Sequence, residues 1–221
     1  MRTGSQVLSF HLLIFMLHHE ALTHEGKAIF PQLEKFEGFH LAGGTALALQ
    51  IGHRISVDFD LFSPEAIPPT LLPKVKRVFE AASCIVSVND SGELTVFVNN
   101  LKLTFLQYPY PVVLDLVSEN GLKLLSIPEI AATKAYTIGR RGSYKDYVDL
   151  YFIIQGRHAS LESIIRLAEK KYQGDFNGRL FLEQLVYLED IQDTEILFLK
   201  EEVTKEKTEE FFEEQIRKST L

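Results

Sequence analysis

Cysteine is nearly absent from this 221-residue sequence, which contains a single one, Cys84. One cysteine cannot form a disulfide within the chain, so the fold has to be stable without covalent cross-links. This composition is typical of proteins from the reducing cytoplasm, and we expect the chain to be cytoplasmic. Cys84 opens an apolar run typical of a strand, which favours core packing over a catalytic role.

The sequence also lacks an apolar run suited to crossing a membrane. The candidate segment, Val7–Leu17, is shorter than the roughly 20 residues that a spanning helix needs, and no convincing cleavage site follows it. We therefore predict no membrane partner and interpret the segment as the start of a buried helix that continues to about Phe36. The histidines of this expected helix do not form a metal motif, because His19 and His24 lie about 140° apart on a helix.

An excess of positive charge is missing as well. Acidic residues outnumber lysine and arginine by 30 to 23, which gives a net charge of −7. The bulk charge therefore gives no support for nucleic-acid binding, which would need a local basic patch. A hydrophobic content of 46% and a charged content of 24% are ordinary for a soluble globular protein. The length fits one or two domains.

The most informative stretch of the sequence runs from Leu41 to Phe62. A short apolar strand over 39–42 leads into Gly43-Gly44-Thr45. A helix of small residues is expected over 46–51, with Gly52 placed to end it. Apolar and polar residues then alternate, which predicts a strand with two different faces. One face carries Ile55, Val57, Phe59 and Leu61, and the other carries Ser56, Asp58 and Asp60.

Asp58 and Asp60 indicate a metal site. Two carboxylates two residues apart on one strand face lie close together, and they repel each other unless a cation lies between them. Mg²⁺ prefers such oxygens and keeps positions for substrate phosphates. Glycines before a helix N-terminus let backbone N–H groups approach an anion. The alternative is a solvated strand face beside a common turn, but the combination in one strand–helix–strand unit favours a phosphate and metal site.

The segments after Phe62 predict an extension of this sheet. A helix is expected over 71–82, followed by strands over 85–88, 94–98 and 101–106 that form a meander with turns at hairpin spacing. Ser126 and Glu129 predict a capping box at the start of a helix that runs to about Ile138. Further helices are expected over 144–155, 161–172, 178–190 and 200–218.

Charged residues of these helices suggest a second wall for the site. Lys134 lies in the middle of an apolar helical stripe, so it either reaches the surface or meets an anion in a cleft, and we favour the cleft. Arg140, Arg141 and Lys145 concentrate positive charge at the start of the next helix, where the helix dipole favours anions. Asp149 is expected to be partly buried and to pair with Lys145 or Lys134. An ordinary ion pair between two helices is the alternative.

Two blocks of the sequence resemble the motifs of one protein family. The first is Gly-Gly-Thr-Ala-Leu followed by His-Arg-x-Ser-x-Asp-x-Asp-Leu-Phe. The second runs from Ile127-Pro-Glu-Ile-Ala-Ala-Thr-Lys134 through Arg140-Arg-Gly-Ser-Tyr-Lys-Asp-Tyr-Val-Asp-Leu150. In this order they resemble the AbiEii/AbiGii-type nucleotidyl transferases, which are toxin-like bacterial proteins with the DNA polymerase β-like nucleotidyltransferase fold.

The resemblance implies an α+β fold, with a mixed sheet and flanking helices over residues 1–125. A helical C-terminal region over 126–221 would complete the cleft. Mg²⁺ would bind Asp58 and Asp60. Catalytic roles are implied for Asp58, Asp60, Lys134 and Asp149. Nucleotide-binding roles are implied for Gly43, Gly44, Thr45, Arg54, Ser56, Arg140, Lys145 and Asp146.

The implied activity is transfer of a nucleoside monophosphate from an NTP to an acceptor hydroxyl of RNA, such as a tRNA 3′ end, or of a protein. The chain would be the toxin of a toxin–antitoxin or abortive-infection system and would have a cognate antitoxin. One feature departs from the fold's pattern, because a third metal-binding carboxylate often stands on a later strand, where this sequence has Thr104. The alternatives are a catalytically silent nucleotide- or partner-binding protein with the same fold, and a metal-dependent phosphohydrolase.

Overall fold

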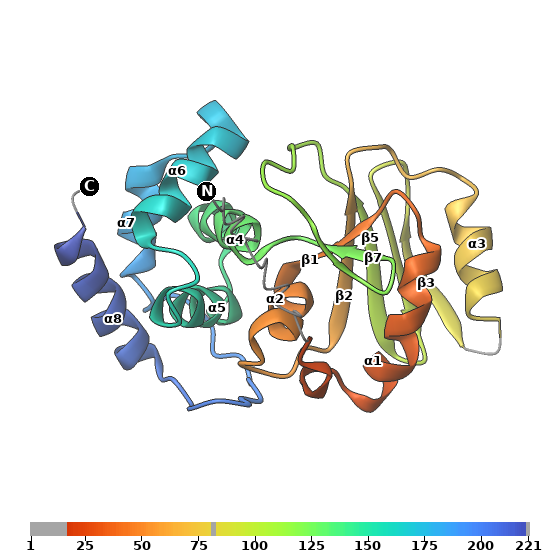
Figure 1. Cartoon of the computed structure of the whole chain (residues 1–221), viewed down its shortest axis with the longest axis horizontal. Coiled ribbons are helices and arrows are strands. Elements are labelled where there is room, and N and C mark those ends of the chain that lie inside the picture. Colours follow the sequence, from red (N-terminus) through yellow and green to blue (C-terminus); the bar gives the residue numbers. More distant parts are fainter. Residues whose placement is uncertain (1–16, 81–82, 220–221) are drawn as a thin grey trace, which may run out of the picture.

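The structure is a computed structural model that describes residues 17–80 and 83–219. Seven strands within these residues form one mixed sheet in the order β3-β4-β5-β2-β1-β7-β6 (Figure 1). The pairs β2–β5 and β1–β7 are parallel, and the other neighbours are antiparallel. The strands are β1 (His40–Ala42), β2 (Asp58–Ser63), β3 (Cys84–Asn89), β4 (Glu93–Val98), β5 (Leu101–Gln107), β6 (Val117–Glu119) and β7 (Leu122–Leu124).

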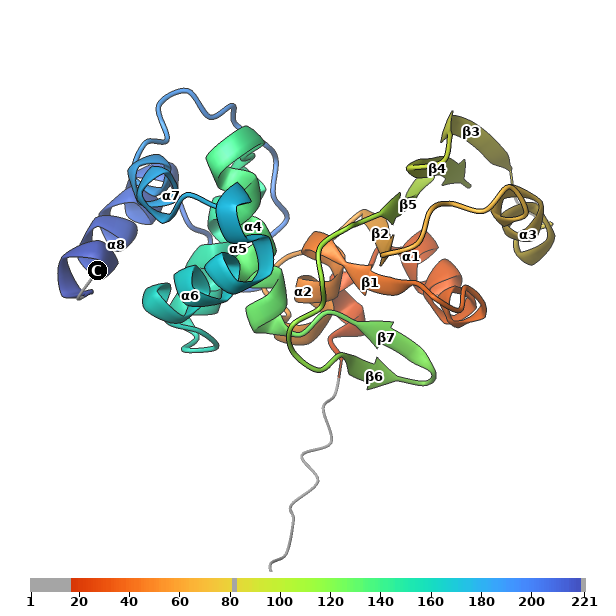
Figure 2. The ribbon, with the colours of Figure 1, turned by 90° about the horizontal axis from the view of Figure 1, so that it is seen from above.

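Helix α2 (Gly43–Ile51) connects β1 to β2 and lies at the centre of the molecule (Figure 2). It begins at Gly43, which has a φ of +65°, and ends at Gly52, where a φ of +58° turns the chain out of the helix. Ala46 and Ala48 are fully buried, and such small side chains let α2 contact the strands on one side and helices α4 and α5 on the other. The predicted strand–helix–strand unit is therefore confirmed.

The remaining helices lie on either side of this centre (Figures 1 and 2). Helices α1 (His24–Ile29) and α3 (Leu71–Val78) lie beside the sheet. The other half of the molecule is helical and follows the last strand in sequence. It contains α4 (Ile127–Arg141), α5 (Tyr144–Gln155), α6 (Leu161–Tyr172), α7 (Gly178–Leu185) and α8 (Lys205–Lys218).

One hydrophobic core runs through both halves, since buried Leu41 and Phe105 of the sheet belong to the same cluster as Tyr147 and Phe212 of the helices. The predicted α+β architecture, a mixed sheet with flanking helices followed by a helical region, is confirmed. The β3–β4–β5 meander is confirmed too. The short hairpin β6–β7 was not predicted.

The predicted long N-terminal helix is wrong where the structure describes it; its first part, residues 7–16, lies outside the described residues. Residues 17–36 contain the 3₁₀ turns His19–Ala21 and Phe30–Lys35, with the short α1 between them. Leu22 is extended and forms a bridge with Ser56, which ends the first turn. Pro31 stands at the start of the second turn, where its ring and missing N–H prevent α1 from continuing.

Two local predictions also need correction. Ser126 makes no side-chain cap hydrogen bond. The Glu129 carboxylate does not reach back to Ser126, because it is buried and accepts from Lys171 Nζ at 2.6 Å and from the N–H groups of Val113 and Leu114. Strand β2 begins only at Asp58, and Val57 before it is half exposed rather than part of an apolar face.

Candidate active site

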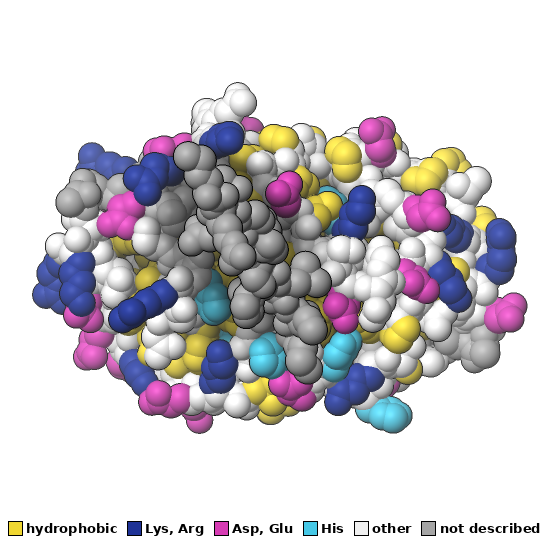
Figure 3. Space-filling view, viewed as in Figure 1, with side chains coloured by type: hydrophobic (Ala, Val, Ile, Leu, Met, Phe, Trp, Pro, Cys, Tyr) yellow, Lys and Arg dark blue, Asp and Glu magenta, His cyan; other side chains and the backbone are white. Residues whose placement is uncertain are grey.

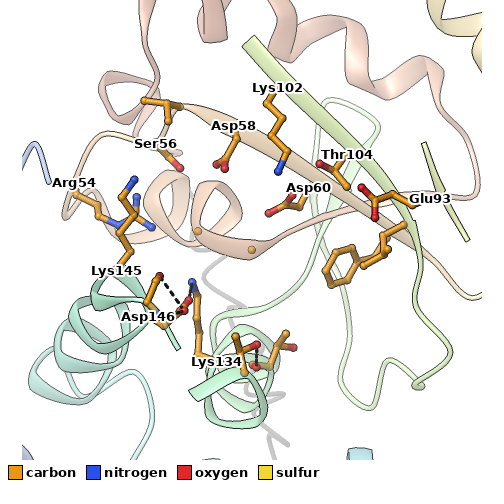
Figure 4. A pocket seen from close by; sticks show the side chains of 18 residues that line it. Arg54, Ser56, Asp58, Asp60, Glu93, Lys102, Thr104, Lys134, Lys145 and Asp146 are labelled. Atoms are coloured by element: carbon orange, nitrogen blue, oxygen red, sulfur yellow. Dashed lines mark hydrogen bonds and ion pairs between the residues drawn. The ribbon is translucent and has the colours of Figure 1, made fainter. Parts of the chain in front are cut away.

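A cleft of about 430 Å³ lies between the sheet and the helical half. Strands β2, β4 and β5 and the start of α2 form one wall, and residues of α4 and the start of α5 form the other (Figure 4). Of the twelve residues predicted for the site, nine line this cleft: Gly43, Gly44, Arg54, Ser56, Asp58, Asp60, Lys134, Lys145 and Asp146.

The aspartate pair lies on the sheet wall of the cleft. Asp58 and Asp60 are half-buried and face the cleft, while Phe59 and Leu61 between and after them are buried in the core on the other face of β2. This alternation follows directly from the two-residue period of a strand. The two carboxylates therefore share one face, as the sequence predicted.

The glycine turn lies against this pair. A Cβ atom on Gly43 would come within 2.6 Å of Asp60 Oδ2, and the positive φ of Gly43 is itself unfavourable for other residues. A Cβ atom on Gly44 would collide with the guanidinium of Arg54. Helix α2 has no side-chain cap at its N-terminus, so its first N–H groups are oriented to receive an anion.

Thr45 lies behind the glycines and does not line the cleft. It is buried, with its Oγ1 2.6 Å from Ser56 Oγ and in contact with the backbone carbonyl of Asp58. These contacts hold the start of β2 against the first turn of α2. Thr45 thus positions the strand that carries the aspartates, whereas we had expected it to contact phosphate.

Asp149 lies beneath the cleft, where it is fully buried. Arg54 approaches it with Nε at 2.8 Å and Nη2 at 3.0 Å, His53 Nε2 lies at 2.7 Å, and Lys134 Nζ lies at 2.7 Å. Burial disfavours the ionised carboxylate, but Arg54 and Lys134 outweigh this effect and hold the pKa of Asp149 well below its usual range. The expected pairing with Lys134 is present, and Lys145 is not a partner of Asp149 in the described structure.

Lys134 joins this buried charge to the cleft. Its Nζ lies 2.7 Å from Asp146 Oδ1, and Asp146 in turn accepts from the N–H and hydroxyl of Ser143 at the start of α5. Burial disfavours the ammonium of Lys134, but Asp149 and Asp146 outweigh this effect and raise its pKa. The lysine is therefore charged and fixed in place on the helical wall.

Arg140 does not line the cleft. Its guanidinium lies over the ring of Tyr136, 3.7 Å from the ring centre, and donates to the carbonyl of Asp175 at 2.7 Å. The side chain of Arg141 lies outside the described part of the chain. Of the three basic residues predicted at this position, the structure therefore places Lys145 in the cleft.

Several residues of the cleft were not predicted. Glu93 comes from β4 and accepts from Thr95 Oγ1 at 2.6 Å, and Lys102 comes from β5. Their alternation with buried Leu94, Leu101 and Leu103 was visible in the sequence. The pairing of β5 with β2, which brings Lys102 opposite Asp58, was not visible in the sequence.

The residues present fit one divalent metal ion. Asp58 and Asp60 supply two hard oxygen donors on one face. In the described residues, no group of three or more His, Cys, Asp or Glu side chains is close enough to hold a metal ion. Thr104 lies opposite Asp60 on β5, at the position where the resemblance implies that a third carboxylate often stands. Any further ligands would come from substrate phosphates or water.

The cleft lies in a protein of mixed surface charge. On the face shown in Figure 3, basic and acidic side chains are interspersed over both halves.

No helix among the described residues is long and apolar enough to cross a membrane.

Solved structures with distant likeness include the JHP933 protein of Helicobacter pylori, with 18% identity, 72% of this chain and 84% of that one covered, and a TM-score of 0.47. The antibiotic-resistance factor ANT(2'')-Ia has 12% identity, covers 64% of this chain and 86% of its own, and has a TM-score of 0.48.

The sequence itself gives a stronger assignment. An uncharacterised protein of Aquifex aeolicus (strain VF5) is 34% identical over 184 residues, which is 81% of this chain and 86% of the relative. The family model described as "Nucleotidyl transferase AbiEii toxin, Type IV TA system" matches residues 27–220. This match confirms the predicted nucleotidyltransferase fold and enzyme class, and the chain belongs to the AbiEii family of nucleotidyl transferase toxins.

Proposed function

We propose that the cleft binds an NTP with Mg²⁺ and transfers its nucleoside monophosphate to a hydroxyl of RNA, such as a tRNA 3′ end. The observation that carries the proposal is the meeting of Asp58 and Asp60 with the Gly43-Gly44 turn on one wall of the cleft, opposite Lys134 and Lys145. Carboxylates, free helix N–H groups and ammonium groups are the partners that a metal-bound triphosphate requires.

Each wall would contribute differently to the reaction. Asp58 and Asp60 would hold Mg²⁺, which supplies charge neutralisation at the phosphates. The N–H groups at the start of α2 would receive phosphate oxygens, and Lys145 would neutralise the leaving pyrophosphate from the other wall. Lys134 is tied to Asp146 at 2.7 Å, so it would present a fixed charge. We propose that Asp149 acts by positioning Arg54 and Lys134, because it is buried beneath them.

The chemical step is an in-line displacement. The acceptor hydroxyl oxygen forms a bond to the α-phosphorus, the bond from the α-phosphorus to the bridging oxygen breaks, and pyrophosphate leaves with that oxygen. The proton of the hydroxyl passes to water. Orientation of the two reactants and neutralisation of charge supply most of the catalysis in reactions of this type.

The test is incubation of the protein with each α-labelled NTP, Mg²⁺ and total RNA, followed by identification of the labelled species. Replacement of both Asp58 and Asp60 by alanine should lower label transfer by at least about a hundredfold, because the metal loses both protein ligands. The matched control removes two acids outside the cleft, Asp115 and Glu119, and should leave transfer unchanged. Transfer that survives in the Asp58→Ala/Asp60→Ala protein would refute the assignment, and label on protein instead of RNA would identify the other acceptor.

A catalytically silent binding protein is the second candidate, and Thr104 favours it because it occupies the position opposite Asp60 where an acid would be expected. Binding of NTP that depends on Mg²⁺, with no labelled product from any RNA or protein pool, would support this candidate. Release of phosphate without a labelled acceptor would indicate a phosphohydrolase.

We further propose that the chain is the toxin of a toxin–antitoxin pair, acts in the cytoplasm and has a cognate antitoxin. Support comes from the description of its family. We also propose that residues 1–125 form the nucleotidyltransferase unit and that 126–221 complete the cleft. Growth arrest on expression, relieved by the Asp58→Ala/Asp60→Ala change, would support the toxin assignment.

A further inference from the structure

Lys102 lies beside the aspartate pair on the sheet wall of the cleft. Strand β5 runs parallel to β2, with Lys102 opposite Asp58 and Thr104 opposite Asp60. Neighbouring strands lie about 4.8 Å apart, and paired residues point to the same face. Lys102 therefore projects into the cleft from the strand next to the aspartates, and Figure 4 shows its amine turned toward them.

In the described part of the chain, Lys102 is next to the aspartates in the sheet but forms no ion pair with them. Lys102 forms no ion pair or hydrogen bond in the described structure, in contrast to Lys134 of the opposite wall, which is paired with Asp146 and Asp149. The side chain is exposed, whereas Leu101 and Leu103 on either side are buried. A metal ion at the aspartates would therefore not have to break an existing pair with Lys102.

The same strand lacks the acid that a second metal ion would need. Thr104 supplies no charge at its position, and no third acid, histidine or cysteine joins Asp58 and Asp60 as a possible ligand within the described residues. Two carboxylates supply oxygen ligands for one divalent ion. A second divalent ion would bring positive charge next to a lysine, which Coulomb repulsion opposes.

We propose that the Lys102 ammonium takes the place of a second metal ion, so that the cleft uses one divalent ion together with one lysine. This inference rests on the proposed function. In the transfer step the ammonium would lie near the acceptor oxygen and the α-phosphate and would stabilise the negative charge that gathers there. A lysine suits this role because its ammonium is a compact charge on a flexible stem.

The experiment measures Mn²⁺ binding by electron paramagnetic resonance. In the presence of an NTP analogue with a methylene group between the α- and β-phosphates, the wild-type protein should bind one Mn²⁺ per chain. Without nucleotide, Lys102→Ala should bind Mn²⁺ about five- to tenfold more tightly, because a neighbouring positive charge has been removed. Lys102→Glu should bind it more tightly still, and Lys102→Arg should resemble the wild type.

The matched control is Lys76→Ala, which removes a lysine from the exposed side of α3, away from the cleft. It should leave Mn²⁺ binding unchanged. Two bound Mn²⁺ ions per wild-type chain would overturn the inference, and so would equal Mn²⁺ affinity in the wild type and all three Lys102 variants. These readouts do not need turnover. If the protein transfers label but the wild type and the Lys102 variants bind Mn²⁺ equally well, only the role of Lys102 is refuted. If Mn²⁺ affinity changes across the variants as expected but no label is transferred, only the proposed function is refuted.

Discussion

Asp149 shows how one buried residue organises several others. It receives Arg54 in a two-point contact, His53 at 2.7 Å and Lys134 at 2.7 Å, and none of these groups is near it in sequence. Removing one member of a buried ionic cluster is costly because the remaining charges lose their partner. The cluster therefore depends on the carboxylate more than on any single cation.

Asp149→Asn should lower the free energy of unfolding by about 3–5 kcal/mol, because buried Arg54 would lose its ion-pair partner and Lys134 would keep only Asp146 as a counter-charge. Urea unfolding followed by circular dichroism measures this change. Glu183→Gln is the control, since it breaks the exposed Arg179–Glu183 pair, and such pairs contribute at most about 1 kcal/mol. A loss in Asp149→Asn no larger than that of the control would contradict this account of the cluster.

The residue scale also shows the limit of sequence reasoning about the site. Asp58 and Asp60 were predictable because both lie on one strand, where the period of two fixes their common face. Lys102 and Glu93 reach the same cleft through strand pairing, which the local sequence pattern does not encode. Thr45 and Arg140 do not line the cleft, because tertiary contacts to Ser56 and Asp175 hold them elsewhere, and the local sequence does not encode such contacts.

At the scale of elements, the junction of β1 and α2 is the most demanding part of the fold. The chain has to turn from a strand into a helix within one residue, and it does so at Gly43 with a positive φ and with Asp60 directly beside it. The sequence signalled this junction through its paired glycines. Pro31 is a sequence signal for the end of a helix, so this break could have been predicted. The break at Leu22 depends on a bridge to Ser56, which the local sequence does not encode.

Gly43→Ala should lower nucleotidyl transfer by at least about tenfold and stability by about 1–2 kcal/mol, because a Cβ there displaces Asp60 and is strained at this φ. Gly38→Ala provides the control. Gly38 also has a positive φ, of +85°, but a Cβ there meets no atom within 4 Å. A similar loss of transfer in both variants would mean that backbone strain, and not the position of Asp60, is responsible.

At the scale of the whole molecule, the two halves meet around His40 as well as around the cleft. His40 is a buried residue of β1, and Lys171 of α6 and Glu129 of α4 influence its charge. Burial, helped by the nearby Lys171 cation, lowers the pKa of His40 to about 4. The folded protein therefore keeps this imidazole neutral at pH values where the unfolded chain binds a proton.

Stability should consequently depend on pH. The contribution of His40 is fully present above its unfolded pKa of about 6.5 and decreases as the pH falls toward 4, by up to about 3 kcal/mol. Urea unfolding at pH 7 and at pH 4.5 measures the difference, and His40→Gln should reduce it. His24→Gln, at an exposed position of α1, should retain the wild-type difference. Equal pH dependence in wild type and His40→Gln would contradict the assignment.

The ion cluster at Asp149 has a mechanical consequence for the cleft. Arg54 precedes β2 on the sheet side, while Lys134 and Asp149 belong to α4 and α5 on the helical side. The ion pairs therefore connect the two walls at the floor of the cleft. Moving the walls apart would separate the buried Asp149 carboxylate from Arg54. Because separating these charges would be costly, we predict that a substrate binds without a large change in the width of the cleft.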